Sequence, residues 1–152
     1  MTELYELTMA NGLFMSGKND EIAYFDVFFR KVPDKGGFAV FAGLSRIIDF
    51  IKNISFTESD LEYLSTLGLC DEFIDYLRNF KFQCDIWSVP EGTPIFPNEP
   101  VIKVRGPIVQ AQLIETFLLL SINHQSLIAT KANRVVRAAE GRTVLEFGSR
   151  RA

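Results

Sequence analysis

Residues 107–147 read PIVQAQLIETFLLLSINHQSLIATKANRVVRAAEGRTVLEF, and this stretch decides the fold class. In its first half Leu113, Phe117 and Leu120 define one face of a helix, and further apolar residues fill the other faces. A helix that is apolar on all sides is expected to be buried. Its more polar second half runs to a glycine stop, after which residues 143–147 are predicted to form a strand. A strand that leads into a new loop is the opening of a further α/β unit.

Shorter helices and strands are predicted upstream of this long helix. The predicted helices cover residues 2–15, 44–51, 57–68 and 71–79, and the predicted strands cover residues 22–29, 38–41, 84–89 and 101–104. The strand at 22–29 is almost continuously apolar and aromatic, so we expect it to be buried. Thr57 and Asp60 have the spacing of a helix-capping arrangement, with Thr57 as the cap. The pattern as a whole predicts an α+β domain.

Composition and charge exclude several classes of protein. The formal net charge is −3 and the isoelectric point is about 5.2, which argues against a general nucleic-acid binder because such proteins carry a basic excess. Cys70 and Cys84 are too few for a disulfide framework and are expected to be reduced thiols in a cytoplasmic protein. No apolar stretch approaches the ~18 residues that a membrane span requires.

Two groups of basic residues are candidate anion sites. Arg150 and Arg151 follow a predicted strand end at a glycine, where guanidinium groups could hold a phosphate, although a solvated charge pair is the simpler interpretation. Lys131, Arg134 and Arg137 are spaced three apart near the predicted C-terminus of the long helix. Basic residues there complement the helix dipole, so a structural role is preferred for these three.

His124 is the only histidine, and its surroundings do not favour catalysis. No cysteine, aspartate or glutamate lies at metal-ligand spacing from it, and no serine or cysteine is placed to form a catalytic triad. A hydrogen-bonded histidine in the core or at an interface is the preferred interpretation. The sequence also lacks the glycine patterns of dinucleotide folds and of phosphate-binding loops.

Eight short segments, spread over nearly the whole chain, carry a family likeness. They are LYELTM (4–9), FDVFFRK (25–31), FAVFAGL (38–44), YLRNFKF (76–82), VPEGT (89–93), FPNEP (96–100), LIATKA (127–132) and LEFG (145–148). In this order they resemble the nicotinate phosphoribosyltransferase family. The resemblance implies the N-terminal α+β domain of a type II phosphoribosyltransferase in residues 1–141. Residues 142–152 would then begin the first strand of an irregular α/β barrel whose remainder is missing.

The resemblance also implies an activity. Enzymes of this family join nicotinate to the ribose of phosphoribosyl pyrophosphate, giving nicotinate mononucleotide and pyrophosphate for NAD biosynthesis. ATP hydrolysis drives the reaction through a phosphorylated histidine, so ATP and Mg²⁺ are the implied cofactors, with sites outside this chain. The implied assembly is a cytoplasmic homodimer with its active site at the subunit interface.

Four residues of this chain match substrate-binding positions of the family. Tyr5 is expected to reach the partner subunit's site and stack near the pyridine ring, and Phe147 to face the same ring. Arg150, and to a lesser degree Arg151, matches a position that contacts phosphate. The family's phosphorylated histidine lies further along the barrel and is not matched by His124. We therefore expect no catalytic residue or metal ligand in this chain, and no activity from the chain alone.

Two alternatives remain open at this stage. A related phosphoribosyltransferase that uses nicotinamide or quinolinate would share the architecture, and only the residues in the eight segments favour nicotinate. A truncated, non-catalytic dimerisation or binding domain is the second alternative. The 14 phenylalanines and an incomplete barrel favour it, because an unfinished fold exposes an apolar patch.

Overall fold

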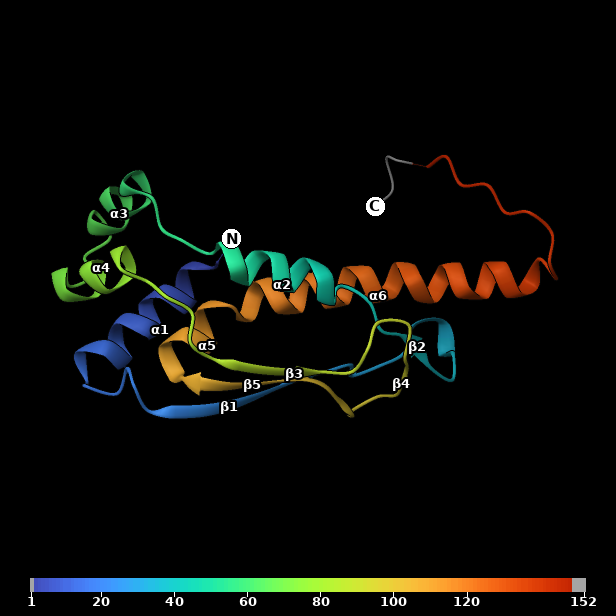
Figure 1. Cartoon of the computed structure of the whole chain (residues 1–152), viewed down its shortest axis with the longest axis horizontal. Coiled ribbons are helices and arrows are strands. Elements are labelled where there is room, and N and C mark those ends of the chain that lie inside the picture. The colour runs from blue at the N-terminus through green and yellow to red at the C-terminus, as the bar shows by residue number, and fades with distance from the viewer. Residues whose placement is uncertain (1, 149–152) are drawn as a thin grey trace.

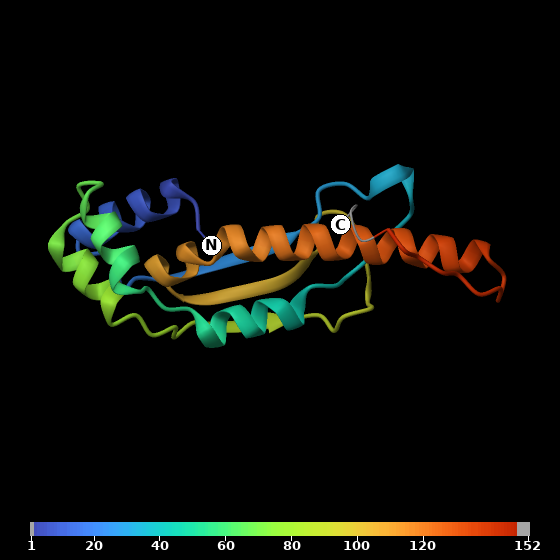
Figure 2. The ribbon, with the colours of Figure 1, turned by 90° about the horizontal axis from the view of Figure 1, so that it is seen from above.

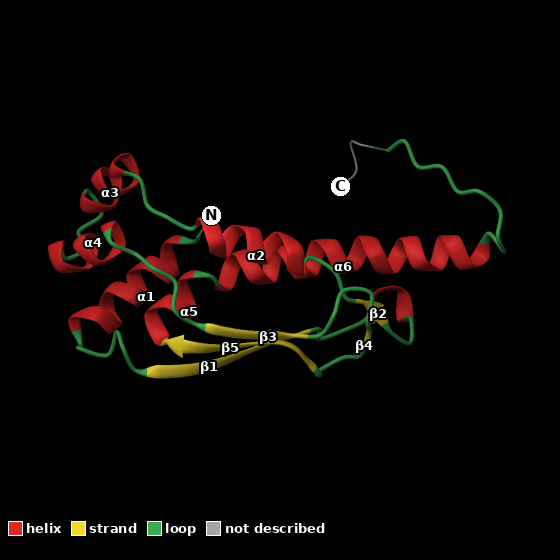
Figure 3. Ribbon diagram, viewed as in Figure 1, coloured by secondary structure: helices red, strands yellow, loops and turns green. Residues whose placement is uncertain are grey.

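Helices and strands both occur in residues 2–148, the part of the chain that the computed structural model describes (Figure 3). The helices are α1 (Leu4–Met15), the short 3-10 helix η1 (Pro33–Lys35), α2 (Leu44–Asn53), α3 (Glu58–Ser65), α4 (Asp71–Arg78), α5 (Ile108–Leu113) and α6 (Glu115–Ala138). The strands are β1 (Ile22–Phe28), β2 (Ala39–Val40), β3 (Asp85–Ser88), β4 (Pro94–Ile95) and β5 (Pro100–Pro107). The predicted α+β class is confirmed.

A three-stranded antiparallel sheet forms one layer of the molecule, and helices cover one of its faces. The strand order is β1-β5-β3, with Tyr24 opposite Arg105 and Arg105 opposite Asp85. Strands β2 and β4 pair separately into a small second sheet. Helices α2 and α6 lie on the same side of the larger sheet (Figure 1), and Figure 2 shows α6 running along the sheet with α2 beside it. The other face of the sheet is left open.

The open face explains why the expectation of a buried strand at 22–29 is wrong. Within β1 only Val27 is buried, whereas Ile22 and Tyr24 are 53% and 64% exposed. Strand β1 is an edge strand of a sheet that has helices on one face only, so its outward side chains have no layer to pack against. An apolar run in the sequence does not reveal whether both faces of a strand are covered.

Two groups of buried side chains hold the elements together. One fills the space between the sheet and α2 and α6, and includes Phe41, Ile47 and Ile102. The other joins α1, α3, α4 and α5 at one end of the molecule, and includes Leu61 and Phe73. Burying side chains of this size stabilises the fold by about 1.5–3 kcal/mol each.

The long helical stretch divides in two, and its burial is only partly as expected. Helices α5 and α6 are separated at Ile114, which is fully buried. Phe117 and Leu118 face the core, but Leu119 and Leu120 are 45% and 46% exposed, so the expectation of all-round burial is wrong for this helix. The second half of α6 extends past the end of the sheet (Figure 1).

Residues 142–148 form no strand, in contrast to the strand expected at 143–147. The segment runs back along α6 on the side away from the sheet (Figure 1), and Phe147 is 86% exposed. A strand requires a hydrogen-bonded neighbour, and residues 2–148 supply none here. The expected domain boundary between residues 141 and 142 stays a prediction.

Candidate functional site

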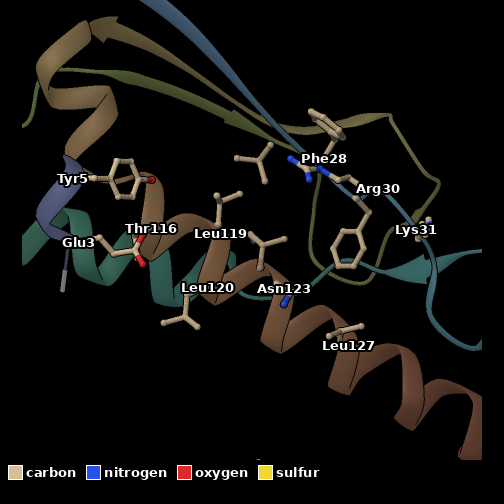
Figure 4. A pocket seen from close by; sticks show the side chains of 13 residues that line it. Glu3, Tyr5, Phe28, Arg30, Lys31, Thr116, Leu119, Leu120, Asn123 and Leu127 are labelled. Atoms are coloured by element: carbon tan, nitrogen blue, oxygen red, sulfur yellow. Dashed lines mark hydrogen bonds between the residues drawn. The ribbon is translucent and has the colours of Figure 1, made fainter. Parts of the chain in front are cut away.

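A groove opens between the start of α1, the end of β1 and the first half of α6 (Figure 4). Its volume is about 540 Å³, which is in the range of small-molecule sites. The lining residues are Glu3, Tyr5, Val27, Phe28, Phe29, Arg30, Lys31, Thr116, Leu119, Leu120, Ile122, Asn123 and Leu127. Three segments that are far apart in the sequence therefore build one concave surface.

One part of the groove is suited to a flat apolar ring. Tyr5 enters it from α1, and Leu119 and Leu120 line it from α6 (Figure 4). Desolvation raises the pKa of Tyr5 above its usual value, and the negative charge of Glu115 raises it further. The phenol therefore remains protonated at neutral pH, so it offers both an aromatic face and a hydrogen-bond donor.

The other part of the groove is cationic. Arg30 and Lys31 leave the end of β1, and neither forms an ion pair with any residue in 2–148. The backbone that carries them is held by hydrogen bonds before Arg30 and after Lys31. Before Arg30, the carbonyl of buried Phe29 accepts a hydrogen bond from the Asn98 N–H at 2.7 Å. Unpaired cations on an anchored backbone suit an anion such as a phosphate.

The turn after Lys31 is held by the long helix. Arg134 of α6 donates from Nη1 to Asp34 Oδ2 and from Nη2 to the Pro33 carbonyl, both at 2.9 Å. Lys131 lies 3.9 Å from the same carboxylate. Arg134 therefore has a structural role other than the expected complement to the helix dipole, because it connects η1 to α6.

The structure places the four expected substrate-binding residues in different surroundings. Tyr5 lines the groove, whereas Phe147 lies in the exposed C-terminal segment and does not line it. Arg150 and Arg151 lie outside the described residues. The resemblance assigns Tyr5 to the partner's site, so Tyr5 and Phe147 need not meet within one chain. Their roles stay predictions.

Arg30 and Lys31 are candidates to which the sequence alone assigned no role, because they directly follow the predicted strand at 22–29. Their signal was available, since they close the FDVFFRK segment that the family likeness includes. His124 is exposed on α6, so the structure excludes the core position, and the alternative position at an interface stays a prediction. Its polar neighbours on the helix, Asn123 and Gln125, are consistent with a solvent-facing stretch.

Within residues 2–148, no group of three or more His, Cys, Asp or Glu side chains lies close enough to hold a metal ion. No helix in this part of the chain combines the length and the hydropathy needed to cross a membrane.

Known proteins resemble this chain over its whole length. A profile of the nicotinate phosphoribosyltransferase (NAPRTase) N-terminal domain matches residues 1–123. A nicotinate phosphoribosyltransferase of Mycobacterium tuberculosis is 47% identical over 152 residues, covering 99% of this chain and 33% of that protein. The nicotinate phosphoribosyltransferase of Bacillus subtilis is 46% identical over 152 residues, covering 99% of this chain and 31% of its own length.

Solved structures extend the comparison to the fold. The crystal structure of human nicotinic acid phosphoribosyltransferase matches 100% of this chain and 31% of its own, with a TM-score of 0.91 and 35% identity. A nicotinate-nucleotide pyrophosphorylase from Pyrococcus furiosus, at 23% identity and a TM-score of 0.75, shows a likeness of fold alone. The chain spans about a third of the length of these relatives. The resemblance carried by the eight segments is confirmed, and the chain belongs to the nicotinate phosphoribosyltransferase family, whose N-terminal domain it matches.

Proposed function

We propose that the protein is a nicotinate phosphoribosyltransferase, which joins nicotinate to the ribose of phosphoribosyl pyrophosphate and releases pyrophosphate. The product, nicotinate mononucleotide, would serve NAD biosynthesis. The observation that carries the proposal is the groove, in which the Tyr5 ring and the unpaired cations Arg30 and Lys31 line one surface. Membership of the family supports this choice of reaction, because relatives at 46–47% identity are named nicotinate phosphoribosyltransferase.

The groove offers what the two substrates require. A planar, electron-poor pyridine ring binds well against an aromatic face such as that of Tyr5. Phosphate groups bind guanidinium and ammonium groups, and Arg30 and Lys31 supply one of each. Holding both substrates in line favours transfer to the ribose, and fixed cations stabilise the charge that develops on the departing pyrophosphate.

We propose a homodimer in which Tyr5 completes the pyridine site of a second copy. In that arrangement Phe147 of the second copy faces the same ring, and its Arg150 and Arg151 contact phosphate. The proposal is supported by the open groove and by Leu119, which is 45% exposed beside Tyr5. Light scattering on the natural full-length protein is expected to give twice the mass of one chain, and a monomer that is active would overturn the shared site.

ATP and Mg²⁺ belong to the proposal as cofactors bound outside this chain. The residues in 2–148 do not fit a metal site, because they contain no candidate ligand group. We place the protein in the cytoplasm, with reduced Cys70 and Cys84.

The test compares three pyridines in the natural full-length protein with phosphoribosyl pyrophosphate and ATP. Nicotinate is expected to give nicotinate mononucleotide at the highest kcat/KM, and omitting ATP is expected to lower turnover. Faster turnover of nicotinamide or quinolinate would assign the protein to a sibling activity, and no product from any of the three would overturn the proposal.

The 152-residue chain on its own is expected to form no product, because most of the barrel is absent from it. Product formation by this purified chain would contradict that expectation. A natural protein of about 17.2 kDa that associates without turnover would favour a binding module instead.

A further inference from the structure

Glu6 is a fully buried acidic residue for which the proposed chemistry has no use. It lies in the first turn of α1 and points to the start of α6. Its Oε1 accepts a hydrogen bond from the Thr116 N–H at 2.7 Å, and its Oε2 accepts one from the Glu3 N–H at 2.9 Å. The Thr2 hydroxyl donates to the same Oε2. One carboxyl group therefore accepts hydrogen bonds from the N-terminal backbone of two helices.

Helix α6 depends on this contact because it has no cap of its own. Its N-cap residue is Ile114, whose side chain makes no capping hydrogen bond. The first N–H groups of a helix lack partners within the helix and form the positive end of its dipole. Glu6 satisfies the Thr116 N–H of α6 and, through Glu3, the start of its own helix. Both helix starts thus converge on one acidic side chain.

A second contact fixes the same junction. The Thr116 hydroxyl donates to Glu3 Oε2 at 2.9 Å, so Glu3 and Glu6 both connect α1 to Thr116. Tyr5 lies between these two glutamates in the sequence. The rotation of the first turn of α1, which sets where the Tyr5 ring points, is therefore fixed against α6 (Figure 4).

We propose that Glu6 is a positioning residue, which holds the start of α1 on α6 so that Tyr5 stays in the groove for the pyridine substrate. The inference rests on the proposed function and deepens it. Glu6 acts through Tyr5 and does not itself touch substrate, because it is completely shielded from solvent. The groove is thus preorganised by a hydrogen-bond junction behind its aromatic wall.

The first test measures kinetics of the natural full-length protein. Glu6→Leu removes every acceptor at the junction and is expected to raise KM for nicotinate about tenfold, with kcat and KM for phosphoribosyl pyrophosphate changed less than about twofold. Asp60→Ala is the matched control, because Asp60 occupies the same position in α3 and accepts from the Thr57 N–H at 2.8 Å. It is expected to cost stability without changing KM.

A double-mutant cycle separates positioning from general stability. If Glu6 acts through Tyr5, Glu6→Leu is expected to change KM for nicotinate less than about twofold when Tyr5→Ala is already present. Independent, multiplying effects of the two substitutions would mean that Glu6 has a merely structural role, and would overturn the proposal.

Hydrogen exchange tests the junction without relying on activity. In Glu6→Leu the Thr116 amide is expected to exchange at least about tenfold faster than in the wild type. If Glu6→Leu does not fold, Glu6→Gln replaces it in this experiment, because the amide keeps one acceptor oxygen. Either the Glu3 or the Thr116 amide then loses its partner and is expected to exchange faster. Unchanged exchange at both amides would overturn the positioning role. If the wild-type protein is inactive, the proposed function is wrong, but hydrogen exchange at the Glu3 and Thr116 amides still tests the junction.

Discussion

Gly43 combines a left-handed backbone conformation with the close approach of another backbone segment. It precedes α2 with a φ of +112°, and a Cβ there would lie 2.8 Å from the Ser121 carbonyl oxygen. Gly43→Ala is therefore expected to lower the free energy of unfolding by about 2–4 kcal/mol, because strain and a backbone clash add. Urea denaturation of the chain measures this. Gly37→Ala is the control, since nothing lies within 4 Å of its Cβ position; equal midpoints for the two variants would contradict the prediction.

Cys84 is a residue whose chemistry is set by burial. Burial, with a smaller contribution from the charge of Asp85, raises the pKa of the Cys84 thiol from 9.0 to about 11. Only the thiolate is nucleophilic, and at pH 8 a pKa of about 11 leaves about one thiol in a thousand ionised. In a Cys70→Ser background, alkylation of Cys84 by iodoacetamide is expected to be slow at pH 8 and to rise about tenfold per pH unit, levelling off only near pH 11. Fast labelling of the folded protein at pH 8 would contradict this.

The same shift has a consequence for stability. The unfolded thiol ionises near pH 9 while the folded thiol remains protonated up to about pH 11, so the unfolded state binds fewer protons between those values. The contribution of Cys84 to stability is therefore complete below pH 9 and is lost as the pH rises toward 11. Cys84→Ala is expected to lack this part of the alkaline destabilisation.

At the scale of elements, two hydroxyl groups of α6 anchor the segment around β2. Ser126 Oγ accepts from the Ala42 N–H at 3.0 Å and donates to the Ala42 carbonyl at 3.1 Å. Thr130 Oγ1 accepts from the Val40 N–H at 2.8 Å. These bonds supply partners to a backbone that has few neighbours in its own small sheet. They also hold the chain that connects the Arg30–Lys31 end of the groove to α2.

Removing such a hydroxyl is expected to leave partly buried backbone groups unpaired. Ser126→Ala should lower the free energy of unfolding by about 1–3 kcal/mol, measured by chemical denaturation. Ser121→Ala on the same helix is the matched control. Ser121 Oγ is buried and has no hydrogen-bond partner within residues 2–148, so its removal is expected to be neutral or stabilising. A larger loss for Ser121→Ala than for Ser126→Ala would refute this account of the anchor.

For the whole molecule, sequence patterns predicted features that depend on residues close by in the chain. They did not predict side-chain exposure where it depends on elements that are distant in the sequence. The cap at Thr57 was predictable because its partner is three residues away, and the Thr57 hydroxyl does accept from the Asp60 N–H at 3.2 Å. The exposure of Tyr24 and Leu119 was not predictable. Tyr24 lies on an edge strand and Leu119 lines a groove, and neither position can be inferred from the strand or helix that carries the residue.

The candidate site shows the same division. Tyr5 was identified through the family likeness of its own segment. Arg30 and Lys31 belong to another such segment, but only the fold shows that they line one groove with α6 and the start of α1. A groove assembled from three separate segments has no periodicity in the sequence. The buried acidic residue Glu6 was also missed, because its partner Thr116 is 110 positions away.

The far end of α6 and the segment after it remain uncovered in this chain. Val135 and Val136 are 43% and 58% exposed, and residues 142–148 are exposed without a neighbouring strand. Such segments open locally at low cost, so limited trypsin digestion of the 152-residue chain is expected to cut first after Arg142 or Arg137. Arg105 should resist, because it lies in β5 between two paired strands.

The same digestion of the natural full-length protein tests what covers this end. The family relatives are about three times as long as this chain, and a barrel that packs on α6 and pairs with the 143–147 segment would protect both sites. Cleavage after Arg137 and Arg142 is therefore expected to slow by at least about tenfold in the longer protein. Equal rates in both proteins would mean that this end of α6 stays exposed and that residues 143–147 do not form the first barrel strand.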